Sequence, residues 1–158
     1  MPASPVPILK SMPLENEAAS EALGAALAPL LRRGDVVCLQ GDLGAGKTTL
    51  ARGLLRALAG DPGMDVPSPT FTLVEVYEFP ALSVWHFDLY RLKQPEDAWE
   101  LGLEQALGEA ASVIEWPERL GALLPAQRLE VRLSTDGAGR RAELAGSAEW
   151  RDRLARLQ

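Results

Sequence analysis

The chain has 158 residues, 47% of them apolar, so one domain over residues 1–158 with a full hydrophobic core is the simplest expectation. Its net charge of −6 argues against a protein that grips nucleic acid through a basic surface, because phosphate contacts need clustered lysines and arginines. The single cysteine, Cys38, excludes an internal disulfide, and one cysteine with one histidine argues against a Cys/His metal centre.

Membrane and export signals are missing from the sequence. No run approaches the ~18 apolar residues of a membrane span. The N-terminus is rich in proline and lacks the apolar core of a signal peptide. We therefore expect a soluble, cytoplasmic protein that does not engage a membrane.

The N-terminal half of the chain predicts two helices around one strand. We expect residues 1–7, which are rich in proline, to be disordered. Apolar residues recur at spacings of three and four over residues 14–31, which predicts a helix. Residues 36–40 predict a buried strand, and residues 49–58 predict a second helix. Residues 60–69, rich in glycine, proline and aspartate, predict a loop.

The C-terminal half predicts more strands and a hairpin. Residues 70–79 and 82–87 read as two strands with a tight turn between them, and residues 95–107 as a helix that begins at a proline. The remaining predicted elements are a buried strand over 112–116, a hairpin of 129–133 and 141–144, and a helix from Ser147. The alternation predicts an α/β fold: a P-loop NTPase domain with a mostly parallel, mixed sheet flanked by helices and a C-terminal β-hairpin.

A phosphate-binding loop, G-x-x-x-x-G-K-[S/T], lies between the first predicted strand and the helix after it. Glycines let successive N–H groups point at an anion, and the helix N-terminus adds positive charge there. We expect Lys47 to reach the β- and γ-phosphates and Thr48 to ligate Mg²⁺. The alternative is a glycine-rich turn without a ligand. The predicted nucleotide contacts in and beside the loop are Asp42, Leu43, Gly44, Ala45, Gly46, Lys47, Thr48 and Thr49.

Two later strands end in acidic residues, as a metal shell requires. Asp88 closes an apolar strand in the Walker B manner, although it could instead cap the next segment. Glu115 ends a second apolar strand, where it would orient water or extend the Mg²⁺ shell; the alternative is a surface glutamate before a turn. Thr70 lies in a loop where GTPases carry their first switch, unless that loop is a rigid turn.

Other polar and aromatic residues receive plainer interpretations. For His86 we favour a structural hydrogen bond over a general base. For Arg91 we favour an ion pair or a partner contact over an arginine finger. We expect Arg140 and Arg141 to flank the hairpin turn and face water. We expect three tryptophans to pack in the core or against helices: Trp85, Trp99 and Trp150.

Five strings, in this order and spacing, resemble the TsaE (YjeE) family over about residues 14–133. They are GDLGAGKTT (41–49), SPTFTLV (68–74), HFDLYRL (86–92), LGL (101–103) and IEWPE (114–118). The second and third strings are far more specific than the phosphate loop. The resemblance implies a small ATPase that uses ATP/ADP and Mg²⁺ and is required for threonylcarbamoyladenosine in tRNA. It also implies slow hydrolysis by the chain alone.

The resemblance further implies partners and residue roles. The chain would act with the TsaB and TsaD proteins, whose complex transfers the threonylcarbamoyl group, and would meet tRNA only through them. It implies a catalytic role for Lys47, Asp88 and Glu115 and Mg²⁺ binding by Thr48, Asp88 and Glu115. It also implies that Thr70 is a switch residue and that Trp116 and Ser20 contact the nucleotide. By this resemblance Ser20 would stand near the adenine, at a position where the family often has threonine.

Two other functions stay open from the residues alone. A small-molecule P-loop kinase usually needs an arginine-bearing lid over the phosphates, and between Asp88 and Glu115 the chain has only Arg91. A non-catalytic nucleotide switch would still work after Glu115→Ala, whereas an ATPase would bind ATP and fail. GTP is disfavoured because the sequence has no Asn-Lys-x-Asp guanine motif.

Overall fold

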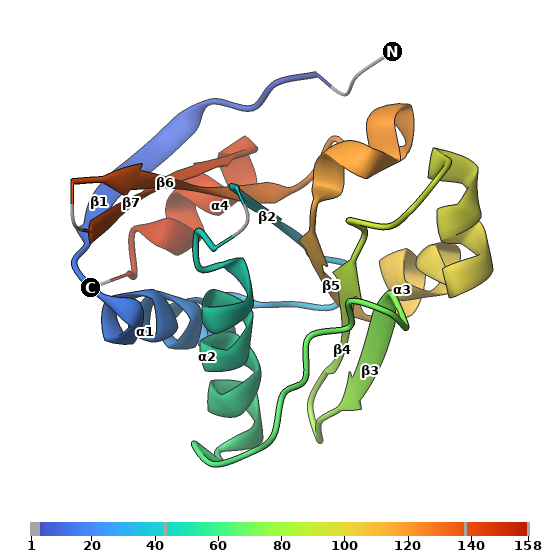
Figure 1. Cartoon of the computed structure of the whole chain (residues 1–158), viewed down its shortest axis with the longest axis horizontal. Coiled ribbons are helices and arrows are strands. Elements are labelled where there is room, and N and C mark those ends of the chain that lie inside the picture. The colour runs from blue at the N-terminus through green and yellow to red at the C-terminus, as the bar shows by residue number, and fades with distance from the viewer. Residues whose placement is uncertain (1–3, 43, 138, 158) are drawn as a thin grey trace.

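A computed structural model describes residues 4–42, 44–137 and 139–157. Its centre is a seven-stranded mixed sheet of order β1-β7-β6-β2-β5-β4-β3 (Figure 1). The strands are β1 (Ile8–Leu14), β2 (Val36–Gln40), β3 (Val74–Glu78), β4 (Ser83–Asp88), β5 (Ala111–Glu115), β6 (Leu129–Asp136) and β7 (Gly139–Gly146). The neighbours β6, β2, β5 and β4 run parallel, and β1, β7 and β3 add antiparallel pairs at the two sides. The expected α/β class, mixed sheet and C-terminal hairpin are confirmed.

Helices cover the sheet, and one of them begins directly after the phosphate loop. The α-helices are α1 (Glu17–Leu27), α2 (Lys47–Ala59), α3 (Leu103–Glu109) and α4 (Ala148–Leu154), and the 3₁₀ helices are η1 (Ala28–Leu30), η2 (Pro95–Leu101) and η3 (Pro117–Leu123). None of the helices in the described part of the chain has the length and apolar character needed to cross a bilayer.

The N-terminal segment differs from its prediction. Residues 8–14 form strand β1, and α1 begins only at Glu17. The helical spacing included Leu14 because this residue enters the core from the end of β1, at 3% exposure. Of residues 1–7, expected to be disordered, residues 1–3 lie outside the described residues. Residues 4–7 are tied to the sheet: Arg128 Nη2 donates to the Ser4 carbonyl at 2.7 Å, and the Gly146 amide donates to the Pro7 carbonyl at 3.0 Å.

Two further elements are shorter than predicted. Residues 70–73 form a turn before β3, since Leu73 takes a left-handed conformation with φ 69° and its carbonyl accepts from the Asp88 amide. The predicted helix over 95–107 is divided into η2 and α3 at Gly102, whose φ is 91°. A Cβ at Gly102 would lie 2.7 Å from the Trp85 ring, so this close approach favours glycine.

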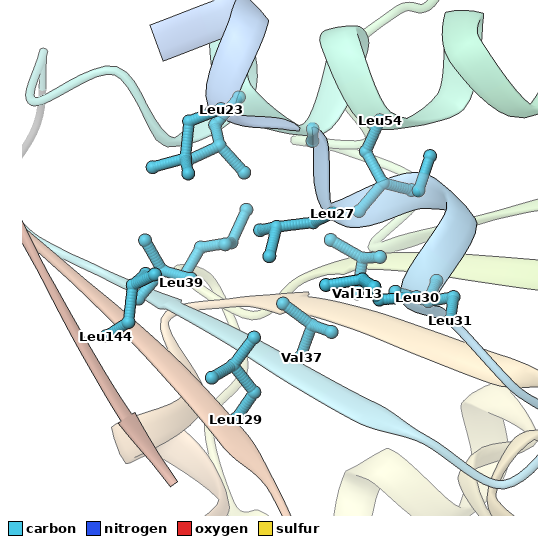
Figure 2. Packing of buried hydrophobic residues seen from close by; sticks show 14 of the residues in the cluster. Leu23, Leu27, Leu30, Leu31, Val37, Leu39, Leu54, Val113, Leu129 and Leu144 are labelled. Atoms are coloured by element: carbon cyan, nitrogen blue, oxygen red, sulfur yellow. The ribbon is translucent and has the colours of Figure 1, made fainter. Parts of the chain in front are cut away.

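Alternation along β2 divides the core into two faces. Val37 and Leu39 pack with the residues of α1 and α2, whereas Val36 and Cys38 pack with the cluster beside η2, α3 and η3. Figure 2 shows Val37 and Leu39 beneath Leu23 and Leu27 of α1. Burying each such leucine contributes about 1.5–3 kcal/mol. Burial also raises the pKa of the Cys38 thiol, which fits the expected inert core position.

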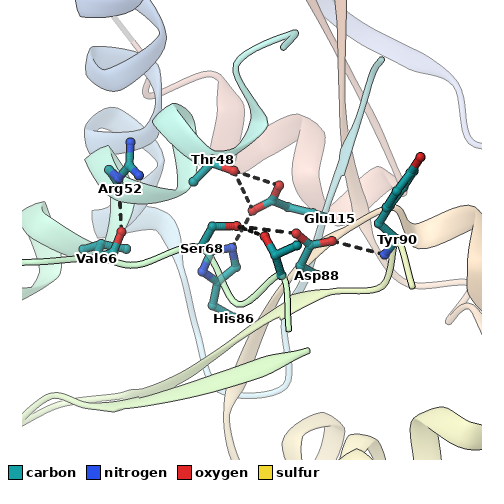
Figure 3. Close-up of polar contacts among 9 residues, drawn as sticks. Thr48, Arg52, Val66, Ser68, His86, Asp88, Tyr90 and Glu115 are labelled. Atoms are coloured by element: carbon teal, nitrogen blue, oxygen red, sulfur yellow. Dashed lines mark hydrogen bonds and ion pairs between the residues drawn. The ribbon is translucent and has the colours of Figure 1, made fainter. Parts of the chain in front are cut away.

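Helices α1 and α2 touch through their backbones. A Cβ at Gly24 would lie 2.0 Å from the Leu50 carbonyl oxygen, and a Cβ at Gly53 would lie 2.1 Å from the Glu21 carbonyl oxygen. Arg52 of α2 donates from Nε to the Val66 carbonyl at 3.1 Å, which attaches the following loop to the same helix (Figure 3). Helix α1 and the loop after α2 therefore both contact the first half of α2.

Candidate phosphate and metal site

The predicted phosphate loop joins β2 to α2 and opens toward a pocket. Gly46 caps α2 in a left-handed conformation with φ 102°, and Gly41 has φ 147°. A Cβ at Gly41 would lie 2.7 Å from the Leu133 carbonyl oxygen, so the turn requires glycine there. Leu43, which we expected to contact nucleotide, lies outside the described residues.

Lys47 lies inside the loop rather than in solvent, at 5% exposure. Its Nζ donates to the carbonyls of Gly41 and Asp42, the latter at 3.1 Å, and stands 4.0 Å from the centre of the Trp116 ring. Burial lowers the pKa of Lys47, and the nearby Glu115 carboxylate opposes that shift. The ammonium group is thus held against the loop carbonyls, and Lys47 also lines the pocket beside the loop.

Glu115 joins the sheet to the first turn of α2. The strand that ends in Glu115 is the direct neighbour of β2, with Leu39 opposite Glu115. The Thr48 hydroxyl donates to Glu115 at 3.1 Å from Oε1 and 3.3 Å from Oε2 (Figure 3). Glu115 is only 2% exposed, so the alternative of a surface glutamate is wrong.

Asp88 lies one strand farther from the loop, opposite Glu115 in the pairing of β4 with β5. It accepts from the Tyr90 amide at 3.1 Å and from the Ser68 hydroxyl at 3.5 Å. The Ser68 hydroxyl also lies 3.0 Å from that of Thr70. Asp88 therefore caps the turn after β4, which was the alternative to a metal-binding role. Through Ser68 it also connects the loop that contains Thr70 to the edge of the sheet.

These residues surround one open pocket of about 270 Å³. Five predicted loop residues line it, namely Gly44, Gly46, Lys47, Thr48 and Thr49, and so do Thr70, Asp88, Glu115 and Trp116. Among the predicted residues that the structure describes, three do not line the pocket: Ser20, Asp42 and Ala45. Asp42 supports Lys47 through its carbonyl, and Ala45 is buried. Ser20 is buried against the loop, with its Oγ 3.6 Å from the place of a Cβ on Gly46.

Arg140 is a pocket residue that the sequence interpretation missed. We expected it to face water, but its Nη2 donates to the Gly44 carbonyl at 2.9 Å and its side chain lines the pocket. Arg141 is exposed, as expected. Nothing local in the sequence marks Arg140, because its position depends on the pairing of β7 with both β1 and β6.

Aromatic residues border the same pocket. Trp116, with φ 59°, packs against Tyr90 at 4.9 Å between ring centres. Arg91 lies 4.7 Å over the ring of Phe71, which is 82% exposed, and is not among the lining residues. This arrangement does not support Arg91 as an arginine finger.

The three tryptophans that we expected to be packed have different surroundings. Trp150 is buried, and Trp85 is half-buried against Gly102. Trp99 is 44% exposed, so that expectation was wrong. Trp99 belongs to η2, the 3₁₀ segment before Gly102, and this shorter element replaces the single longer helix for which packing was predicted.

Comparisons with known proteins agree with one another. The family model "Threonylcarbamoyl adenosine biosynthesis protein TsaE" matches residues 14–142. The tRNA threonylcarbamoyladenosine biosynthesis protein TsaE of Rickettsia bellii is 41% identical over 120 residues, covering 76% of this chain and 83% of that protein. The protein of the same name from Haemophilus influenzae is 42% identical over 110 residues, covering 69% and 68%.

A solved structure extends the similarity to the fold. YdiB of Bacillus subtilis superposes with a TM-score of 0.76 at 26% identity, covering 94% of this chain and 93% of that one. The matched region holds the phosphate loop, both strand-end acids and the loop that contains Thr70. The chain therefore belongs to the TsaE family of threonylcarbamoyl adenosine biosynthesis proteins.

Proposed function

We propose that this protein is a Mg²⁺-dependent ATPase that serves the formation of threonylcarbamoyladenosine in tRNA, working with the TsaB–TsaD complex. The observation that carries the proposal is the hydrogen bond from Thr48 to Glu115, beside the buried Lys47. It joins the hydroxyl that follows the P-loop lysine to a buried carboxylate at the edge of the same pocket.

The donor set suits Mg²⁺ rather than a softer metal. Thr48, Glu115 and Asp88 offer only oxygen atoms, which hard cations prefer. Among the described residues, no group of three or more His, Cys, Asp or Glu side chains could hold a metal by itself. Mg²⁺ is usually bound by one or two protein oxygens together with substrate phosphates, so this sparse set fits a metal that arrives with ATP. When bound, Mg²⁺ would offset charge on the β- and γ-phosphate oxygens.

The chain's own residues would divide the work of hydrolysis. Loop amides and Lys47 would bind the phosphates, with Lys47 exchanging its carbonyl contacts for phosphate oxygens. Glu115 or Thr70 would orient the attacking water, whose oxygen bonds to the γ-phosphorus as the bond to the β-phosphate oxygen breaks. Trp116 would border the nucleotide and limit access of solvent.

The partner proteins would hold the tRNA, which this chain would not bind directly. A net charge of −6 fits a protein that meets other proteins while tRNA is held elsewhere. We propose that hydrolysis resets the TsaB–TsaD complex between turnovers, is slow without it, and takes place in the cytoplasm with tRNA modification. The position of Arg91 over Phe71 gives no support to the kinase alternative.

Hydrolysis by purified protein tests the proposal. ATP turnover should require Mg²⁺ and rise when TsaB–TsaD is added. Glu115→Ala should keep ATP binding and lose turnover, whereas Glu100→Ala, at an exposed position of η2, should resemble wild type. Full turnover by Glu115→Ala, or none by wild type with its partners, would contradict the proposed ATPase.

A further inference from the structure

The single histidine of the chain is buried beside the acid of the pocket. His86 lies on β4 at 0% exposure, and its Nε2 is 2.7 Å from Oε2 of Glu115 (Figure 3). Within the described part of the chain, the side chains that hydrogen-bond to Glu115 are His86, from the neighbouring strand, and Thr48, from α2. His86 does not line the pocket, so it reaches the pocket only through Glu115.

We propose that His86 is a positioning residue, which fixes the Glu115 carboxylate toward Thr48 and thereby sets the affinity of the nucleotide complex for Mg²⁺. This inference rests on the proposed function. A glutamate side chain can rotate its carboxylate freely. The Glu115 carboxylate is instead fixed in one plane, because His86 of β4 and Thr48 of α2 both hydrogen-bond to it. Hydrogen-bond partners behind a metal ligand commonly change metal affinity about 10- to 100-fold.

The other ring nitrogen supports the direction of this hydrogen bond. His86 Nδ1 is buried and has no hydrogen-bond partner within residues 4–42, 44–137 and 139–157. A buried N–H without an acceptor is costly, so the ring is best satisfied with its proton on Nε2, where Glu115 accepts it. An imidazole that donates this hydrogen bond orients the Glu115 carboxylate and leaves it negatively charged. A bound cation needs that negative charge.

Equilibrium titration of Mg²⁺ measures the proposed effect without turnover. Mg²⁺ is added to the protein with a non-hydrolysable ATP analogue, and tryptophan fluorescence reports the half-saturating concentration. His86→Leu removes the donor at a similar volume and should raise that concentration about 10- to 100-fold. Affinity for the analogue in EDTA should stay near that of wild type.

Two more variants separate positioning from packing. His86→Gln keeps an N–H donor and should recover most of the Mg²⁺ affinity. Ser112→Ala is a matched control on β5, because Ser112 is buried and its Oγ has no partner in the described part of the chain. A folded His86→Leu protein with the wild-type Mg²⁺ response would overturn the inference, while a wild type without any Mg²⁺ response would overturn the proposed function together with it.

A spectroscopic test needs no substitution. Because the chain has one histidine, the imidazole nitrogen resonances of untagged ¹⁵N-labelled protein belong to His86 without further assignment. We expect the proton on Nε2, and a shift of that resonance when Mg²⁺ joins the nucleotide complex. A proton on Nδ1, or an imidazole nitrogen resonance whose chemical shift does not change when Mg²⁺ is added, would contradict the positioning role. This holds even if His86→Leu fails to fold.

Discussion

The Thr48 hydroxyl lies 3.1 Å from Glu115 Oε1 and so connects the first turn of α2 to the end of β5. Thr48 follows the loop lysine, and Glu115 ends the strand that pairs directly with β2. The acid nearest the loop therefore comes from β5, while Asp88 stands one strand farther away. The order of strands therefore places Glu115 beside the loop strand and Asp88 on the next strand.

Replacement of Lys47 tests the phosphate loop. Lys47→Ala should weaken ATP binding by roughly 1.5–3 kcal/mol, or about 10- to 150-fold, because charge-assisted contacts to phosphate are lost. Isothermal titration measures the change, and Lys93→Ala, at an exposed position, is the control. Equal affinity in wild type and Lys47→Ala would exclude the loop as the phosphate site.

Replacement of the candidate metal-shell residues tests the Mg²⁺ site. Thr48→Ala and Asp88→Ala should each abolish the Mg²⁺ dependence of hydrolysis, since each removes an oxygen from the pocket wall. The measurement is ATP turnover as Mg²⁺ is varied. Thr72→Ala, at an exposed turn position outside the pocket lining, serves as the control. A variant that retains the full metal response would remove its residue from the proposed shell.

Arg140 and its neighbour form a matched pair for nucleotide affinity. Arg140→Ala should weaken ATP binding about 2- to 10-fold, because it loses the contact that holds the Gly44 carbonyl and a positive charge in the pocket. Arg141→Ala removes the same charge from an exposed position and should bind as wild type does. Identical losses in both variants would reduce the role of Arg140 to general electrostatics.

The contact between α1 and α2 predicts a stability effect. Gly24→Ala should lower the free energy of unfolding by about 1–3 kcal/mol, because its methyl group would meet the Leu50 carbonyl oxygen at 2.0 Å. Gly108→Ala is the control, since nothing lies within 4 Å of its Cβ position. Urea denaturation compares the two, and an unchanged midpoint for Gly24→Ala would contradict the close packing.

Local patterns predicted much of the fold and the centre of the site. The phosphate loop, the apolar strands and the acids at their ends are short-range features, so Lys47, Thr48 and Glu115 could be found without a structure. Strand β1 could not be predicted from the sequence alone. Its partner β7 lies more than a hundred residues later, and the apolar spacing of β1 continues into that of α1.

Contacts between distant segments were beyond local patterns. The positions of Arg140 and of the His86–Glu115 pair depend on which strands become neighbours in the sheet. The sequence motifs gave Asp88 and Glu115 similar roles, and His86 was expected to make only a structural hydrogen bond. Only the order of strands reveals that Glu115 is closer to Thr48 and that His86 supports it.

Quantification of modified nucleosides in bulk tRNA, after depletion of this protein in its own host, tests the central claim most directly. We predict a selective fall in threonylcarbamoyladenosine by mass spectrometry, restored by the wild-type gene but not by Lys47→Ala. An unchanged level of threonylcarbamoyladenosine in depleted cells, with other modifications as reference, would contradict the proposed role in tRNA modification. Full rescue by Lys47→Ala would contradict the need for the nucleotide site.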